Sequence, residues 1–257
     1  MTTTESQAVA HAPHGPLTEY YKTEEDRQAF LRGIFNDTAA DYDRIEAMLA
    51  WGTGSSYRRE ALKRAGLKPG MKVLDVGVGT GLVAAQACML VGDPSLVTGI
   101  DPSSGMLAAS KLPKTMVLME GRAESLPFPD NHFDFLSMGY ALRHISDLGI
   151  AFTEFERVLK PGGLLCVLEI TQAQSRFGKW LLKSYMRGVI PLLTRFISRK
   201  AHTATIWRYY WDSIEACVPP AQVMATLSAA NFTQVRRHLE VGIFSEYQAV
   251  KSGVAPT

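Results

Sequence analysis

The sequence predicts an α/β protein with a mostly parallel sheet, helices on both faces of the sheet and a C-terminal antiparallel hairpin. Between Lys72 and Val250, short apolar runs rich in β-branched residues alternate with stretches of helical composition. Alternation at this spacing is typical of a parallel sheet that is buried on both sides. The last two runs have strand composition and are joined by a short link, which predicts the hairpin.

The predicted strands and helices follow one another in a regular order. The first apolar run, KVLDVG, covers residues 72–77, and the helical stretch LVAAQACMLV covers residues 82–91. A second run at 96–100 leads into a helix at 103–112, which Ser103 begins as an N-cap. The later elements are strands in TMVLMEG, FDFLSMG and LLCVLEI, helices near LGIAFTEFERVL and 220–230, and hairpin strands in TQVRRHL and IFSEYQAVK.

Two helical segments lie outside this alternation. Residues 19–66 predict a helical cap before the first strand, and residues 172–211 predict a helical lid inserted after the fifth strand. The first 18 residues are polar and contain two prolines, which predicts a disordered tail. We therefore expect one domain over residues 19–257, preceded by a tail over residues 1–18.

The composition excludes several classes of protein. Apolar residues make up 46% of the 257 residues, which is enough for a large core and excludes global disorder. A net charge of +2 is too small to indicate nucleic-acid binding, and none is expected. Three separate cysteines without a CxxC pair argue against disulfides and zinc, so no metal site is expected. Without a recognisable signal peptide or transmembrane run, we expect a cytoplasmic protein.

The stretch VLDVGVGTG at 73–81 follows the first predicted strand, where open α/β sheets bind ligands. Its glycines, Gly77, Gly79 and Gly81, allow the backbone to turn sharply and a ligand to approach closely. Asp101 ends the second predicted strand, where a carboxylate can accept hydrogen bonds from both ribose hydroxyls of an adenosine group. The loop and Asp101 together predict a nucleoside cofactor site.

The spacing of the glycines narrows the choice of cofactor. They run GxGxG, so Leu82 takes the place of the third glycine of a dinucleotide fingerprint. The Gly-Lys-Ser/Thr ending of a phosphate-binding P-loop is also absent from this stretch. What remains is a loop suited to a small, zwitterionic adenosine ligand without phosphates.

These residues resemble a known family of enzymes. Asp-x-Gly-x-Gly-x-Gly after the first strand, with an acid ending the second, is similar to the class I S-adenosylmethionine (SAM) methyltransferases, whose fold is Rossmann-like. Four further segments resemble the ubiquinone/menaquinone C-methyltransferase (UbiE-like) family: FNDTAADYD (35–43), RAESLPFPDNHFD (122–134), YALRH (140–144) and RVLKPGGLLCVLEI (157–170). The resemblance runs from about Phe35 to Lys251 and implies a SAM-dependent methyltransferase.

The resemblance also implies which residues contact SAM. The matching positions are Tyr42, Asp75, Gly77, Gly79, Gly81, Asp101, Met106, Ala123 and Glu124. Asp101 is expected on the ribose, Met106 beside the adenine, and Tyr42 in the N-terminal helix that closes over the cofactor. Ala123 and Glu124 follow the third strand, where the backbone of the family meets the adenine edge.

The acceptor side of the site is expected after the fourth strand, where the family has an Arg-Asn pair. Arg143 matches the arginine, and His144 replaces the asparagine. Arg143 is a candidate to stabilise a phenolate, and His144, whose reference pKa is near neutral, is a candidate general base. The structural alternatives are a salt-bridged arginine and a histidine that only packs.

The sequence departs from the family on this acceptor side. The family pattern Phe-Gly-Ile-His-Arg-x-Trp-Lys reads WGTGSSYRR here (51–59), and Ile45-Glu46 replaces a Met-Asn pair. Our first hypothesis is methyl transfer to a small hydrophobic, aromatic acceptor, with quinol-type C-methylation foremost. Two alternatives stay open: O- or N-methylation of a secondary metabolite or lipid amine, and a SAM-binding assembly protein without catalysis.

The predicted lid has an unusual composition. From 171 to 211 the chain contains eight Lys or Arg, no Asp or Glu, and many interleaved aromatic and aliphatic residues. A basic amphipathic segment suits an anionic membrane surface or a lipid-borne acceptor, and it equally suits a lid with a solvated face. A peripheral membrane contact and a homo-oligomer are both compatible with this pattern.

Overall fold

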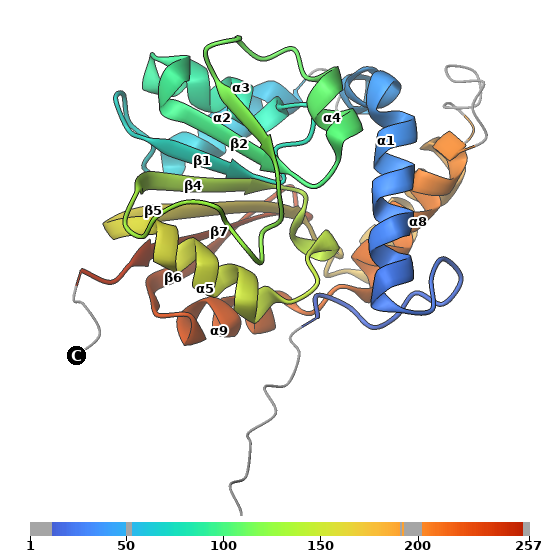
Figure 1. The fold of residues 1–257 in the computed structure, drawn as a ribbon. Coiled ribbons are helices and arrows are strands. Elements are labelled where there is room, and N and C mark those ends of the chain that lie inside the picture. Colours follow the sequence, from blue (N-terminus) through green and yellow to red (C-terminus); the bar gives the residue numbers. More distant parts are fainter. Residues whose placement is uncertain (1–11, 50–52, 191, 193–201, 254–257) are drawn as a thin grey trace, which may run out of the picture.

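The computed structural model describes residues 12–49, 53–190, 192 and 202–253. Within these residues, seven strands form one sheet in the order β3-β2-β1-β4-β5-β7-β6, with helices on both faces (Figure 1). The strands are β1 (Val73–Val76), β2 (Val97–Asp101), β3 (Val117–Glu120), β4 (Phe133–Gly139), β5 (Leu159–Ile170), β6 (Phe232–Glu240) and β7 (Phe244–Lys251). The first five run parallel, and β7 is antiparallel to β5 and β6. The predicted fold class is confirmed, including its hairpin.

The central strands are buried because their side chains alternate between two cores, one on each face of the sheet. On β4, Phe135 shares a core with α2 and α3, while Leu136 shares the opposite core with α5 and α9. This double burial explains why the strands appear in the sequence as nearly continuous apolar runs. The helices are α1 (Glu24–Leu49), α2 (Gly54–Arg64), α3 (Leu82–Val91), α4 (Ser104–Ala109), α5 (Leu148–Val158), α6 (Arg176–Ser184), α8 (His202–Ala216) and α9 (Pro220–Ala229).

Side-chain caps fix where two helices begin after their strands. Ser103 accepts a hydrogen bond from the backbone N–H of Met106 at 3.1 Å, so α4 begins where the serine predicts. Asp147 accepts from the N–H groups of Gly149 and Ile150 at 2.8 and 3.0 Å and begins α5 in the same way. Each cap accepts hydrogen bonds from backbone N–H groups that have no partner inside the helix, and this fixes the residue at which the helix begins.

The helices from the two segments outside the alternation meet beside the carboxyl ends of the strands, where Figure 1 shows α1 and α8 next to each other. Ile34 of α1, Met186 of the π-helical turn η3 (Tyr185–Val189), and Trp207 and Trp211 of α8 share one core. From the predicted cap, only α1 joins this layer, because α2 packs with α3 on a face of the sheet. None of the helices in the described ranges is both long and apolar enough to cross a bilayer.

The predicted tail is wrong for its last part. Residues 1–11 lie outside the described residues, but His14 is only 7% exposed and forms an antiparallel bridge with Cys217. The backbone carbonyl of Pro13 accepts a hydrogen bond from the N–H of Val218 at 2.7 Å. A backbone bridge of this kind ties polar residues to the body of the protein without any local apolar pattern.

Candidate active site

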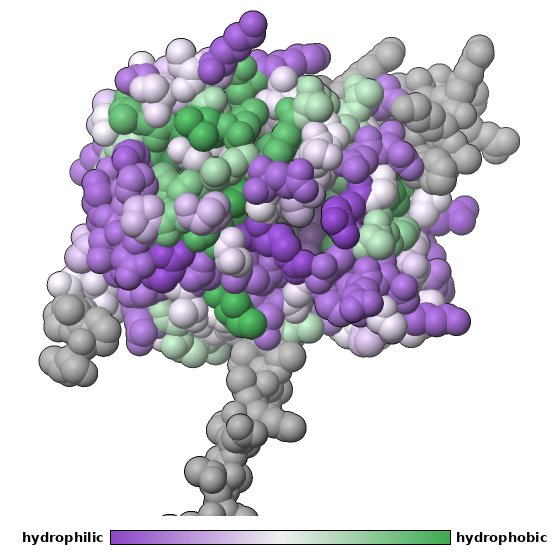
Figure 2. Space-filling model, viewed as in Figure 1, coloured by the Kyte–Doolittle hydropathy of each residue, from purple (hydrophilic) through white to green (hydrophobic). Residues whose placement is uncertain are grey.

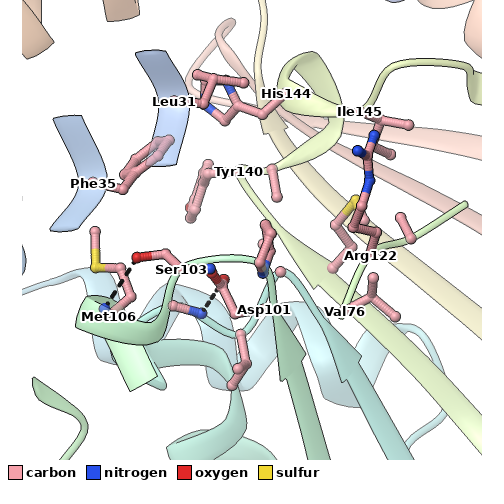
Figure 3. A pocket seen from close by; sticks show the side chains of 18 of the residues that line it. Leu31, Phe35, Val76, Asp101, Ser103, Met106, Arg122, Tyr140, His144 and Ile145 are labelled. Atoms are coloured by element: carbon pink, nitrogen blue, oxygen red, sulfur yellow. Dashed lines mark hydrogen bonds between the residues drawn. The ribbon is translucent and has the colours of Figure 1, made fainter. Parts of the chain in front are cut away.

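A cavity of about 540 Å³ lies at the carboxyl ends of β1, β2 and β4. Figure 3 shows Asp101 and Met106 at one end of it, Leu31 and His144 at the other, and Phe35 and Tyr140 between them. In Figure 2 the surface is hollowed beside α1, and mostly hydrophilic residues border the hollow. Ligands of open α/β sheets bind at this edge, so the cavity lies where the sequence predicts a site.

Most of the residues predicted to form the site line this cavity. They are Tyr42, Asp75, Gly77, Gly79, Asp101, Met106, Ala123, Glu124 and His144. Two predicted residues, Gly81 and Arg143, are not among the lining residues. Gly81 instead begins α3 with φ +98°, and a Cβ atom there would lie 2.4 Å from the side chain of Leu112. Its glycine is therefore required by packing.

The loop after β1 needs glycine for two further reasons. Gly77 has φ +67°, and a Cβ atom on it would lie 2.6 Å from the Cβ of Ala141. Gly79 has φ +56°, which strains any residue with a side chain, although the space beside it is open. The N–H groups of Gly77 and Val78 both donate to the carbonyl of Ile100, at 2.8 and 3.0 Å. This hydrogen bonding holds the bare backbone of the loop against the cavity.

Asp101 is the acid that ends β2, and it is only 8% exposed. One carboxylate oxygen accepts from the N–H of Gly79 at 2.8 Å, and the other accepts from the N–H of Ser103 at 2.8 Å. Burial raises the pKa of Asp101 to about 6, although both hydrogen bonds oppose this shift. Each oxygen keeps a lone pair, so the carboxylate can accept further hydrogen bonds from a ligand in the cavity.

Asp75 lies in β1 below the glycine loop and is 1% exposed. One of its oxygens accepts from the hydroxyl of Ser137 at 2.6 Å, while Oδ2 is buried and has no hydrogen-bond partner among the described residues. Burial raises the pKa of Asp75 to about 7, against the effect of Ser137. A cation bound beside this buried carboxyl would favour its ionised form and lower its pKa.

The loops after β3 and β4 are tied to each other at the edge of the cavity. The carboxylate of Glu124 accepts from the backbone N–H of Ser146 at 2.6 Å and from Arg122 at 3.4 Å. Arg122 in turn donates to the hydroxyl of Ser146 at 2.9 Å. The side chain of Glu124 therefore holds a loop, and both Ala123 and Glu124 line the cavity.

Helix α1 is fastened to the sheet over the cavity by polar contacts. Asn36 accepts hydrogen bonds from the hydroxyl of Ser103 at 2.7 Å and from the N–H of Gly105 at 2.9 Å. Closer to the C-terminal end of the helix, Asp43 accepts a hydrogen bond from the hydroxyl of Thr80 in the glycine loop. The position of α1 is thus fixed by the same loops that form the expected cofactor site.

Tyr42 of α1 and Tyr210 of α8 meet in the wall of the cavity, with their hydroxyl oxygens 2.8 Å apart. Burial raises the pKa of both phenols, so both remain neutral hydrogen-bonding groups at physiological pH. The two hydroxyls place a polar pair within a wall that also carries the rings of Phe35 and Tyr140.

His144 lines the cavity at the end of the 3₁₀ turn η2 (Leu142–His144). Its ring stacks on Tyr209 with centroids 5.6 Å apart, and its Nδ1 lies 3.3 Å from the Tyr209 hydroxyl. The Nε2 atom is buried without a hydrogen-bond partner among the described residues. Burial, and next to it the positive charge of Arg143, lower the pKa of His144 well below its ordinary value. The ring is therefore uncharged at neutral pH, which corrects the near-neutral titration expected from its reference value.

Arg143 points away from the cavity. Its side chain is 1% exposed, and its guanidinium pairs with the buried carboxylate of Glu169. It also donates to the hydroxyl of Ser213 at 3.0 Å and lies 4.7 Å from the ring centroid of Tyr210. Arg143 therefore does not line the cavity, because Glu169 of β5 and Ser213 of α8 already hold its guanidinium.

Sequence reasoning missed Arg58 of α2, which lines the cavity and is 3% exposed. Its guanidinium donates to Glu46 of α1 at 2.5 Å and lies 5.5 Å from the ring centroid of Tyr140. The sequence has two adjacent arginines here, Arg58 and Arg59, and composition alone does not show which one faces inward. The helical periodicity of α2 offers the only signal, since Arg58 precedes the buried Ala61 and Leu62 by three and four positions.

The fold is shared with solved methyltransferases. A chain from Thermotoga maritima, described as a SAM-dependent methyltransferase and possible histamine N-methyltransferase, matches with a TM-score of 0.60 and 21% identity, over 86% of this chain and all of that one. Phosphoethanolamine N-methyltransferase 2 of Haemonchus contortus, solved with S-adenosyl-L-methionine, matches with a TM-score of 0.55 and 18% identity, over 77% of this chain and 52% of that one. At such identities the likeness establishes the fold alone.

Sequence comparison is more specific. The model of the ubiE/COQ5 methyltransferase family matches residues 21–251. The ubiquinone/menaquinone biosynthesis C-methyltransferase UbiE of Shewanella sp. (strain W3-18-1) is 33% identical over 224 residues, which cover 84% of this chain and 88% of that protein. The UbiE of Shewanella sediminis is 32% identical over the same length. On the strength of these matches, the chain belongs to the ubiE/COQ5 methyltransferase family and is a SAM-dependent methyltransferase.

Proposed function

We propose that this methyltransferase transfers a methyl group to a ring carbon of a hydrophobic, phenolic acceptor of the quinol type. The observation that carries the proposal is the position of His144, an uncharged imidazole that lines the cavity together with the aromatic side chains of Phe35, Tyr140 and Tyr210. The named activity of the Shewanella relatives, C-methylation in ubiquinone and menaquinone biosynthesis, agrees with it.

The residues at the other end of the cavity fit SAM. A Cβ atom on Gly77 would meet Ala141, so only bare backbone passes there, and the loop suits a ligand that approaches closely. Asp75 supplies a negative charge beneath the loop that suits an ammonium group, and Asp101 has free lone pairs for ribose hydroxyls. Arg58 adds a cation that suits a carboxylate. When bound, SAM supplies a methyl group that its sulfonium has already activated.

The chain itself then has to align the acceptor and exclude water. Phe35 and Tyr140 offer flat apolar surfaces for an aromatic ring between the glycine loop and His144. The hydroxyls of Tyr42 and Tyr210 offer hydrogen bonds to an acceptor oxygen. Helix α1 covers the cavity and is fastened by Asn36, so the same helix closes the site and provides part of its wall.

Methylation of an aromatic carbon replaces a C–H bond by a C–C bond, so one proton must leave the acceptor. In our proposal His144 takes it at Nε2, which is buried and has no hydrogen-bond partner among the described residues, and the Nδ1 proton is donated to Tyr209. Its low pKa makes it a poor base toward a resting phenol. The acceptor becomes strongly acidic, however, as the incoming methyl group makes the ring cationic, and the neutral imidazole can accept the proton at that stage.

We assign Arg143 a positioning role rather than a catalytic one. Its guanidinium lies against the ring of Tyr210 behind the cavity wall. Its hydrogen bonds to Glu169 and Ser213 anchor the η2 turn, which also contains His144. Arg58, by contrast, lines the cavity, where its guanidinium is paired with Glu46.

The test is to identify the product. The purified enzyme is incubated with methyl-labelled SAM and either an alkylated hydroquinone, kept reduced with dithionite, or a long-chain primary amine. We expect label on a ring carbon of the hydroquinone, located by mass spectrometry with fragmentation. Label on the oxygen, or on the amine alone, would overturn the proposal in favour of O- or N-methylation. The matched control is the di-O-methyl ether of the same hydroquinone, which has no acidic proton and should not react.

A further inference from the structure

Helix α6 (Arg176–Ser184) carries an exposed apolar face. Phe177 is 70% exposed, Trp180 is 63% exposed and Leu181 is 54% exposed. Their spacing of three and four residues places them on one side of the helix, where Phe177 and Trp180 stack with ring centroids 6.0 Å apart. Large side chains at these exposures are an anomaly on a protein whose other aromatic residues are mostly packed.

The opposite side of α6 is anchored, which fixes the direction of the exposed face. Leu182 and Tyr185 pack against the core that contains Met186, Trp207 and Trp211. This core belongs to the helical layer of α1 and α8 that also carries Tyr42 and Tyr210 of the cavity. The exposed face therefore looks outward from the layer that closes the active site.

Basic side chains lie beside this apolar face. Arg176, Lys179, Lys183 and Arg187 are all exposed, and at helical spacing they fall along one flank of Trp180. The chain from 171 to 211 contains no acidic residue. Two of these basic side chains contact acids in the last part of α8. Arg187 lies 3.7 Å from Asp212, and Lys183 lies 3.6 Å from Glu215.

We propose that α6 is a membrane-docking helix that lies in the interface of an anionic lipid bilayer. Phe177, Trp180 and Leu181 would enter the boundary between headgroups and acyl chains, and Arg176 and Lys179 would contact anionic headgroups. The positive charge of the basic flank favours a bilayer over a second copy of this chain as the partner of this face. A second copy of the same face would bring like charges together, whereas an anionic bilayer satisfies the apolar residues and the basic flank at once.

Docking in this way would bring the layer of α1 and α8 to the membrane surface, where a hydrophobic acceptor is dissolved. The proposal does not depend on which atom of the acceptor is methylated. It predicts that substitutions in α6 change lipid binding and the use of membrane-dissolved acceptors, while turnover of a water-soluble acceptor stays the same.

The experiment is co-sedimentation of the full-length protein with vesicles of phosphatidylcholine alone or with phosphatidylglycerol added. We expect binding to the anionic vesicles at low salt, weaker binding as salt rises, and roughly tenfold or more loss in the double variant Phe177→Ser, Trp180→Ser. A second variant, Arg176→Glu with Lys179→Glu, should lose binding to the anionic vesicles only. The matched control is Ile150→Ser, at a residue that is 54% exposed on α5 and should bind as the parent does.

Three results would overturn the proposal. The first is no binding of the parent to anionic vesicles at low salt. The second is equal binding by the parent and both α6 variants, which would place the lipid contact elsewhere. The third comes from analytical ultracentrifugation without lipid: a dimer that the Phe177, Trp180 variant abolishes would identify a second copy as the occupant. Unchanged circular dichroism and turnover of a short-chain hydroquinone show that the variants are folded.

Discussion

Arg143 forms a buried ion pair with Glu169, and both side chains are 1% exposed. The pair joins η2, which follows β4, to the carboxyl end of β5. Next to Arg143 in the sequence, His144 turns the other way and lines the cavity. Arg143 of the predicted Arg-His pair thus supports the cavity wall from behind, and His144 lines the cavity.

Breaking this ion pair should destabilise the protein strongly. Glu169→Gln leaves the guanidinium of Arg143 buried without a counter-charge, and removing one partner of such a pair typically costs about 3–5 kcal/mol of the free energy of unfolding. The measurement is urea unfolding followed by circular dichroism. Glu60→Gln is the control, because it removes an exposed ion pair with Lys63 and should leave the transition in place.

Replacing both partners separates stability from catalysis. Arg143→Leu combined with Glu169→Leu removes both charges, and it should recover most of the stability lost in Glu169→Gln. If the role of Arg143 is to hold Tyr210 and His144 in place, this double variant should bind SAM with the affinity of the parent. Its turnover should fall, because Tyr210 and His144 are no longer held. A stable double variant with full turnover would show that the pair has no role in positioning.

Asp101 should contribute directly to SAM binding. Asp101→Ala removes the carboxylate proposed to accept the ribose hydroxyls, and charge-assisted hydrogen bonds contribute roughly 1.5–3 kcal/mol, so the affinity should fall about tenfold or more. Isothermal titration calorimetry measures the change. Because the same carboxylate holds Gly79 and Ser103, Asp101→Asn is compared beside it and should lose less affinity. Asp93→Asn, which alters a cap outside the cavity, should bind SAM like the parent.

SAM binding should depend on pH and release protons. Burial raises the pKa of Asp75 to about 7 and that of Asp101 to about 6, so both carboxyls are partly protonated in weak acid. A ligand with a net positive charge favours the ionised forms and lowers both pKa values when it binds. The affinity should therefore rise between about pH 5 and pH 8 and level off above that range.

Proton release can be measured by calorimetry in two buffers that differ in ionisation enthalpy. The observed heat of SAM binding near pH 6.5 should differ between the buffers in the direction of protons leaving the protein. Asp75→Asn should bind SAM more weakly and reduce the release. An affinity that stays constant across this pH range in the parent would contradict the proposed contact of SAM with the two acids.

The sheet and the glycine loop were predictable because their signals are local. Strands buried on both faces appear as apolar runs, and Gly77 and Gly79 mark backbone that a side chain would obstruct or strain. The bridge between His14 and Cys217 was not predictable in this way, since the two residues are separated by most of the chain. The residues around His14 contain no pattern that predicts its burial, because the burial depends on a backbone segment far away in the sequence.

The directions of Arg143 and His144 were hidden for a different reason. The two residues lie in a 3₁₀ turn, where successive side chains point about 120° apart. A motif in the sequence places both residues after β4 but does not say which one faces the cavity. The answer depends on Glu169 of β5, which is distant in the sequence. Arg143 donates to this buried carboxylate, and His144 therefore lies on the side of the turn that lines the cavity.

His144 should act in the chemical step and not in SAM binding. His144→Ala should lower the single-turnover rate with the hydroquinone by roughly 10²–10⁴-fold, the usual contribution of general-base catalysis. SAM affinity should stay within about twofold, since a contact made only in the transition state affects rate and not ground-state binding. His132→Ala, which changes a histidine outside the cavity, serves as the control.

The pH dependence of that rate decides whether His144 is the base. Burial and Arg143 hold its pKa well below the ordinary value, so its base form already predominates at neutral pH. With SAM at saturation, the rate of the parent should be flat from about pH 6.5 upward and fall only in more acidic solution, as His144 gains a proton. The acidic fall should vanish in His144→Ala. A rise near neutral pH that survives the substitution would come from the acceptor itself, and it would favour an amine over a phenol.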